Sequence, residues 1–160
     1  SRYIYEGNAR AEFHEDLINL INNFLSISQK PVTERILELL NLFKNESVHI
    51  ERKKFTLPYL KGIRLIKPEK SGFDAIVCAK AANEPWIVAI KNGVLSEIDV
   101  TEFMSECKRY GQPRSQRKII IALNNIEANV KLKSLQEKII TWQAQELNFL
   151  FELYNKPAIV

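Results

Sequence analysis

The sequence is poor in the residues that build disulfide scaffolds and many metal centres. Its 160 residues include two cysteines, two histidines and five glycines. Two cysteines cannot form a disulfide framework, so we expect a reduced, cytoplasmic protein. No apolar run approaches the roughly 18 residues that a membrane-spanning helix needs. The first residues also lack the charged and apolar regions of a secretion signal. We therefore expect no association with a membrane.

Several motifs that identify enzyme classes are missing as well. The sequence contains no GxxxxGK phosphate loop, no GxGxxG, no HExxH, no CxxC pair and no GxSxG. We interpret His14 and His49 as surface or structural histidines, and Cys78 and Cys107 as small core residues. Phosphate-loop enzymes, dinucleotide-binding domains, zinc proteases and serine hydrolases therefore have no support in the sequence.

What remains has the composition of one globular domain. Hydrophobic residues make up 46% of the chain, charged residues 26%, and the net charge is +4. The length suits a single domain over 1–160. We expect a helical N-terminal part over 1–46 and a sheet core with flanking helices over 47–160. Because the chain starts at Ser1 rather than Met, we expect a domain excised from a longer protein.

The hydrophobic pattern predicts an α/β domain with a mixed sheet. Residues 73–78 and 86–91 are apolar strands that we expect to pair as a hairpin. The continuous apolar run over 118–123 is typical of a buried parallel strand. The other expected elements are an N-terminal helical pair (9–26 and 33–44), extended segments within 48–57 and 62–66, a helix from about 99 to 110, a helix over 128–137, a short strand over 139–142 and a last helix ending near 154.

Two charges interrupt the apolar strands. Asp74 lies at the start of one predicted strand and Lys91 at the end of the next. Burying an unpaired charge is costly, so each needs a partner, a capping role or a metal. A hairpin would place both on one face, within ~8 Å of each other. A simple ion pair between Asp74 and Lys91 is the structural alternative to a functional site.

Basic residues are concentrated in one segment. The segment from Cys107 to Lys118, both included, contains five basic residues and no acidic residue. Such a cluster either is solvated surface or contacts phosphate groups. The residues we expect to contact a nucleic-acid backbone are Arg109, Arg114, Arg117 and Lys118.

The order of these segments resembles the PD-(D/E)xK nuclease superfamily. The matching residues are Gly72-Phe73-Asp74, Val88-Ala89-Ile90-Lys91, the helix from Asp99 and the strand Lys118-Ile119-Ile120-Ile121. The resemblance implies a restriction-endonuclease-like mixed sheet flanked by helices. It also implies cleavage of DNA phosphodiester bonds with Mg²⁺ or Mn²⁺, which oxygen ligands hold. Asp74 would bind the metal and Lys91 would orient the attacking water.

The sequence departs from the family pattern at the second acidic position. The motif places Glu or Asp two residues before the lysine, where this chain has Ala89, and a methyl group cannot bind a metal. Three explanations stay open. The acid was removed by engineering; or it moved to the following helix, with Glu106 a better candidate than Glu102 because it borders the apolar face; or the site is dead and the fold serves binding.

An acidic residue of the first helix often completes the metal site in this family, and Glu12 would take that role here. The resemblance thus implies a nuclease-like domain that acts on DNA more readily than on RNA, and is inactive or impaired because of Ala89. No bound metal is then required. The alternative is a non-catalytic nucleic-acid-binding or assembly module. The nearly all-apolar helix over 33–44 favours an interface with a second copy or with other domains.

Overall fold

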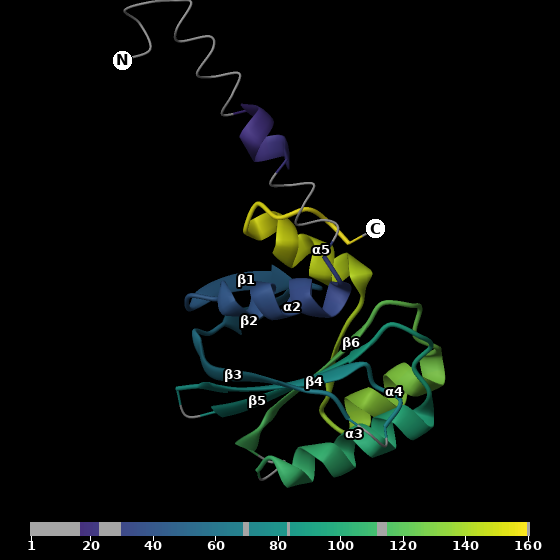
Figure 1. Ribbon diagram of the computed structural model, residues 1–160. Helices are drawn as coiled ribbons and strands as arrows, with labels where there is room; N and C mark the ends of the chain where they lie inside the picture. The colour runs from purple at the N-terminus through teal and green to yellow at the C-terminus, as the bar shows by residue number, and fades with distance from the viewer. Residues whose placement is uncertain (1–16, 23–29, 69–70, 83, 112–114, 160) are drawn as a thin grey trace, which may run out of the picture.

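The structure, a computed structural model, describes residues 17–22, 30–68, 71–82, 84–111 and 115–159. Residues 17–22 are helical. The elements that follow, with the labels of Figure 1, are α2 (Val32–Asn41), β1 (Glu46–Ile50), β2 (Lys53–Leu57), β3 (Leu60–Ile66), β4 (Ala75–Ala81), β5 (Glu84–Lys91), α3 (Glu97–Arg109), β6 (Arg117–Ala122), α4 (Ala128–Gln136), β7 (Ile140–Trp142) and α5 (Ala144–Leu153).

A five-stranded mixed sheet organises the domain, with the strand order β3-β4-β5-β6-β7. Strands β3, β4 and β5 form an antiparallel meander, whereas β5, β6 and β7 run parallel and are joined by the crossover helices α3 and α4. Because β4, β5 and β6 are covered on both faces, nearly all their side chains are buried. The predicted hairpin, the buried parallel strand and the mixed α/β sheet are confirmed.

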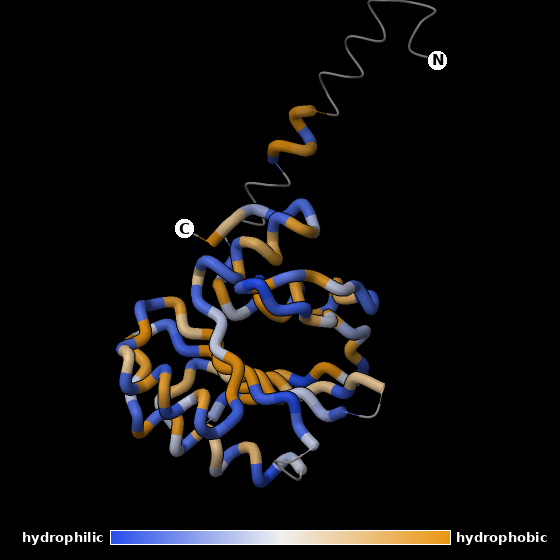
Figure 2. Tube along the Cα trace, turned by 180° about the vertical axis from the view of Figure 1, so that it is seen from behind, coloured by the Kyte–Doolittle hydropathy of each residue, from blue (hydrophilic) through white to orange (hydrophobic). Residues whose placement is uncertain are grey.

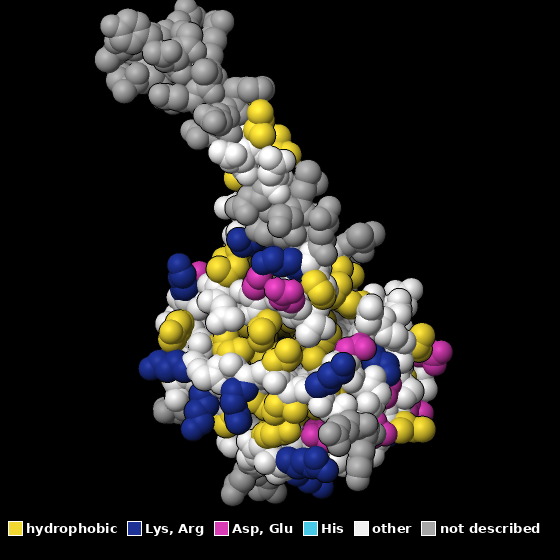
Figure 3. Space-filling view, in the orientation of Figure 1, with side chains coloured by type: hydrophobic (Ala, Val, Ile, Leu, Met, Phe, Trp, Pro, Cys, Tyr) yellow, Lys and Arg dark blue, Asp and Glu magenta, His cyan; other side chains and the backbone are white. Residues whose placement is uncertain are grey.

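The sheet separates two hydrophobic clusters, one on each face (Figure 1). Helices α2 and α5 and the separate β1–β2 hairpin cover one face, and Trp86, Val88 and Ile90 point toward them. Helices α3 and α4 cover the other face, where Ile87 and Ala89 lie. In Figure 2 the central strands are mostly hydrophobic, as this double cover requires. On the face seen in Figure 3, Lys and Arg side chains surround the hydrophobic ones.

Helix α2 is covered within the chain, which removes the main reason for expecting a second copy against it. Its buried residues include Ile36, Leu39 and Leu40, which belong to the cluster shared with α5. Arg35 is also buried, and its guanidinium donates to the carbonyls of Pro157 and Ala158. The apolar circumference of this helix therefore reflects intramolecular packing. No helix in the described part of the chain is long and apolar enough to cross a membrane.

Candidate active site at the ends of β4 and β5

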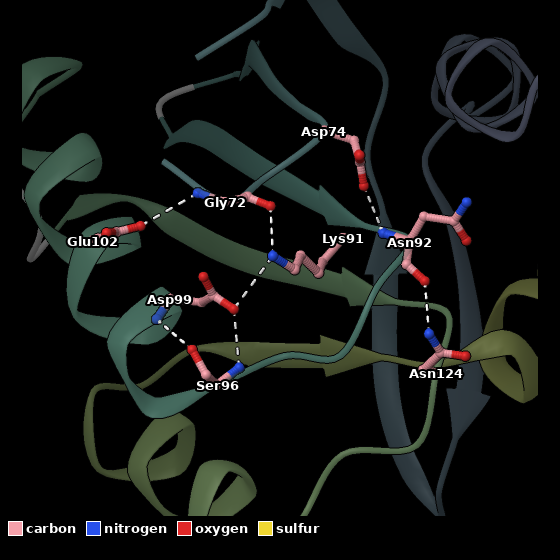
Figure 4. A network of polar contacts seen from close by, with 8 residues as sticks. All are labelled: Gly72, Asp74, Lys91, Asn92, Ser96, Asp99, Glu102 and Asn124. Carbon is pink, nitrogen blue, oxygen red and sulfur yellow. Dashed lines mark hydrogen bonds and ion pairs between the residues drawn. The ribbon is translucent and has the colours of Figure 1, made fainter. Parts of the chain in front are cut away.

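Asp74 and Lys91 lie opposite each other where β4 begins and β5 ends. Ala75 pairs with Ile90 in the antiparallel register, and the backbone N–H of Asp74 donates to the Ile90 carbonyl at 2.9 Å. The hairpin therefore brings the two predicted residues to one end of the sheet. Their side chains nevertheless point to different partners (Figure 4). The alternative of a simple Asp74–Lys91 ion pair is not found among the described contacts: Lys91 pairs with Asp99, and Asp74 accepts from the Asn92 N–H.

Lys91 reaches toward the first turn of α3. Its Nζ donates to the Gly72 carbonyl at 2.6 Å and lies 3.5 Å from a carboxylate oxygen of Asp99. The side chains of Lys91 and Asp99 are 16% and 9% exposed, so water screens this ion pair less than one on the open surface. The ammonium is held by one carbonyl and one carboxylate.

Asp99 is fixed by its position in α3. Ser96 is the N-cap: its Oγ accepts from the Asp99 N–H at 3.2 Å, and the Asp99 carboxylate accepts from the Ser96 N–H at 2.9 Å. This reciprocal pair is a capping box, in which two free N–H groups of the helix start find acceptors. The sequence pattern Ser-x-x-Asp carries this signal, and α3 begins at Glu97, two residues before the expected start at about 99.

Asp74 is held by the turn that follows β5. Its Oδ2 accepts from the Asn92 N–H at 2.6 Å, and the Asn92 carbonyl accepts from Asn124 Nδ2 at 2.8 Å. Asn124 follows β6, so this chain of hydrogen bonds joins the ends of three strands (Figure 4). Asp74 itself is exposed at this end of the sheet.

The structure brings Glu102, rather than Glu106, to this cluster. Glu102 Oε2 lies 3.4 Å from the Gly72 N–H, whereas Glu106 lies one turn further along α3 and pairs with Arg109 at 3.6 Å. The preference for Glu106 rested on its proximity to the apolar face of the helix. The residues before Asp74 cross the first turns of α3 instead, and they meet Glu102 there.

Ala89 lies in the core between two neighbouring strands. It is fully buried, faces Ile76 and Ile120 in the register, and belongs to the cluster under α3. Among the described residues, no group of three or more His, Cys, Asp or Glu side chains could hold a metal ion. Asp99 pairs with Lys91, and Asp74 is turned toward Asn92. The described residues therefore provide no site with three such ligands, and Glu12 lies outside them.

The predicted backbone contacts are dispersed over the structure. The Arg109 side chain is 69% exposed. Arg117 Nε lies 3.3 Å from Glu84, with its guanidinium 5.3 Å from the centre of the Phe55 ring. Lys118 is buried at 7% exposure, and Arg114 lies outside the described residues. Of the three that are described, Arg109 is the most exposed, the Arg117 side chain is 41% exposed beside Glu84, and Lys118 is buried.

Burial makes both cysteine thiols poor candidates for a catalytic nucleophile. Both are free and buried in the same cluster, Cys78 on β4 and Cys107 on the inward face of α3. Burial raises the pKa of the Cys107 thiol to about 12 and also raises that of Cys78. Neither thiol is positioned as a nucleophile, because the reactive thiolate is disfavoured in both.

Comparisons with known proteins support the fold. No family model matches the sequence, and no curated protein matches it. A solved structure described as EndoMS in its apo form superimposes with a TM-score of 0.50 at 16% sequence identity, covering 69% of this chain. The match covers 43% of the EndoMS chain, so this chain spans less than half of that protein. The likeness shows that the two chains share a fold.

Proposed function

We propose that this chain is a PD-(D/E)xK-type nuclease-like domain that binds the DNA backbone and whose cleavage is impaired by Ala89. The fold is shared with the structure described as EndoMS in its apo form, and the sequence resembles a superfamily whose members cleave DNA. The residues that the family motif would use, Asp74 and Lys91, lie at the paired ends of β4 and β5. DNA is the preferred substrate class over RNA for the same reason.

The observation that carries the proposal is the position of Ala89. It precedes Lys91 by two residues on β5, so the two side chains share one face of the strand. A carboxylate there would lie beside Lys91, as the motif requires. Without it, Lys91 turns to Asp99, and the described carboxylates do not gather at one point. The family's Mg²⁺ or Mn²⁺ would supply charge stabilisation at the scissile phosphate when bound.

The decisive experiment restores the missing acid. Ala89→Glu, Ala89→Gln and the unaltered chain are incubated with supercoiled plasmid in Mg²⁺ and in Mn²⁺, and nicking is followed by gel. We expect nicking by Ala89→Glu alone. Ala89→Gln has nearly the same size without the charge, so it controls for disruption of the buried site. Far-ultraviolet circular dichroism reports whether each variant folds.

The outcomes separate the competing explanations. Cleavage by the unaltered chain that Asp74→Ala abolishes would show an active centre completed by another acid, with Glu102 as the described candidate. If folded Ala89→Glu does not nick and the unaltered chain still binds DNA in fluorescence anisotropy, the domain is a binding module. If the unaltered chain neither cleaves nor binds DNA at low salt, the proposal is wrong.

A second candidate, an assembly module, is favoured by the helical residues 17–22. Four apolar side chains of this segment are exposed, Leu20 at 63% and Ile21 at 49% among them. Exposed apolar residues at this density mark contact surfaces. Light scattering on Leu20→Ser, with Leu17→Ser as a second variant, tests this: a mass that falls from a dimer to one chain would support assembly through this segment.

A further inference from the structure

A basic groove lies at the other end of the β4–β5 hairpin, away from Lys91. Its volume is about 620 Å³, and it is lined by residues of β3, β4 and β5 together with Arg109 and Tyr110 at the end of α3. Small-molecule pockets commonly occupy ~300–1,000 Å³, so the groove has room for a nucleotide. The family motif does not point to this place, and of the described residues of the predicted basic cluster the groove includes Arg109.

Four cations line this groove and no carboxylate does: Lys61, Arg64, Lys80 and Arg109. Among the described residues, no carboxylate lies within ion-pair distance of Lys61, Arg64 or Lys80, while Arg109 has Glu106 at 3.6 Å. In Figure 3, Lys and Arg side chains gather at the left edge of the sheet, over the ends of β3 and β5.

Lys61 and Lys80 are direct partners in the β3–β4 register. Like charges placed opposite each other across two strands destabilise a sheet. An anion that binds between the two ammonium groups relieves this repulsion, since neither lysine has a carboxylate partner among the described residues. The register therefore provides an argument for a ligand that is independent of the shape of the groove.

The backbone of β3 is also irregular here. The register shifts between Lys61 and Arg64, and Gly62 between them has a φ of 61°, in the left-handed region that favours glycine. A bulge of this kind redirects the neighbouring side chains of an edge strand. Lys61 and Arg64, on either side of this irregularity, both line the groove.

We propose that this groove binds a phosphodiester backbone of DNA, as a second contact distinct from the Lys91 end of the sheet. The proposal rests on the proposed function for its choice of DNA among polyanions. Pro85 in the groove lies six positions before Lys91 on β5, a distance of about 20 Å at 3.3 Å per residue. Phosphates near the two ends of the hairpin would then belong to one bound DNA molecule.

The test uses two single variants and one matched control. Lys61→Glu and Lys80→Glu each replace a like-charge pair with a Lys–Glu pair, so both should fold and melt at or above the temperature of the unaltered chain. Lys44→Glu changes the net charge equally, at an exposed position of the layer on the opposite sheet face. Binding of a fluorescein-labelled 20-base-pair duplex is followed by anisotropy between 50 and 300 mM salt.

If the groove holds one phosphate per lysine, each groove variant should bind about tenfold more weakly at 100 mM salt, with a salt slope shallower by about 0.9. Lys44→Glu should leave both values unchanged. Equal binding by the groove variants and Lys44→Glu would overturn the groove while leaving DNA binding in place. No binding by the unaltered chain would overturn the proposed function, and this inference with it.

Discussion

The ammonium of Lys91 lies 3.5 Å from the carboxylate of Asp99, the same carboxylate that accepts the Ser96 N–H at the start of α3. One side chain thus links the end of β5 to the helix that follows it. Because both partners are mostly buried, the position of Lys91 depends on the integrity of the capping box.

Removal of Ser96 and removal of Asp99 from the capping box should therefore lower stability by different amounts. Ser96→Ala removes the cap hydroxyl alone, and we expect it to lower the free energy of unfolding by about 1 kcal/mol. Asp99→Ala also leaves the Lys91 ammonium without its carboxylate, so a larger loss of about 2–3 kcal/mol is expected. Urea unfolding with an unchanged m-value measures both. Equal losses would mean that the Lys91–Asp99 pair adds nothing.

The sequence predicts the sheet better than it predicts the site. The apolar runs of β4, β5 and β6 identify buried strands because their composition follows from cover on both faces. The carboxylate that Lys91 meets depends on where the residues around Gly72 cross α3, which is a tertiary relationship. A helical wheel contains no information on that crossing, and it therefore ranked Glu106 above Glu102.

The β1–β2 hairpin shows a second limit of the sequence pattern. The alternation over 48–57 indicates extended chain, but the turn lacks the Asn-Gly or Asp-Gly signal of a two-residue hairpin. Glu51 and Arg52 both have positive backbone φ values, 52° and 66°. Residues other than glycine and asparagine rarely adopt this conformation. Phe55 of β2 packs against Trp142 of β7, and this contact holds the hairpin in place in spite of the turn.

Arg52→Gly should accordingly stabilise the protein. Glycine adopts a φ of 66° without the steric cost that arginine carries there, although it adds freedom to the unfolded chain. We expect a net gain of about 0.5–1 kcal/mol in thermal or urea unfolding. Lys54→Gly, placed inside β2, is the matched control and should lose stability. A loss with Arg52→Gly would show that the turn carries no strain.

Gly72→Ala should disturb the Lys91 cluster directly. A Cβ at this position would lie 2.7 Å from Lys91 Nζ and 2.8 Å from Asp99 Oδ1, closer than real contacts allow. Lys91 is flexible and can withdraw, whereas Asp99 is held by Ser96. We expect a loss of about 1–2 kcal/mol, as for modest overpacking. Gly93→Ala, whose added Cβ would lie 3.7 Å from Lys91 Cε, an ordinary contact distance, should cost less in the same measurement.

The two thiols should resist modification in the folded protein. Burial raises the pKa of Cys107 to about 12 and that of Cys78 in the same direction, so neither forms a thiolate near pH 8. Reaction with a disulfide reagent at pH 8 should be slow without denaturant and release two equivalents in urea. Rapid reaction of one thiol in the native protein would place that cysteine at a surface opening.

Glu146 should make stability depend on pH in the direction opposite to that of a salt-bridged acid. Burial is the main reason why its pKa lies above the usual 4.5, and the neighbouring Glu51 carboxyl adds to the shift, although the Gln143 N–H favours the charged form. Between pH 4.5 and the raised pKa of Glu146 in the folded protein, the folded chain binds more protons than the unfolded chain. The free energy of unfolding therefore falls as the pH rises through this window, and it levels off above it. Glu146→Gln removes this titrating carboxyl. The free energy of unfolding of the unaltered chain, measured with urea at each pH and compared with that of Glu146→Gln, should decline over the same window. Glu51→Gln keeps the burial but removes the second carboxyl, so it should show a smaller decline. A relative stability that rises with pH would mean that the folded protein favours the carboxylate at Glu146.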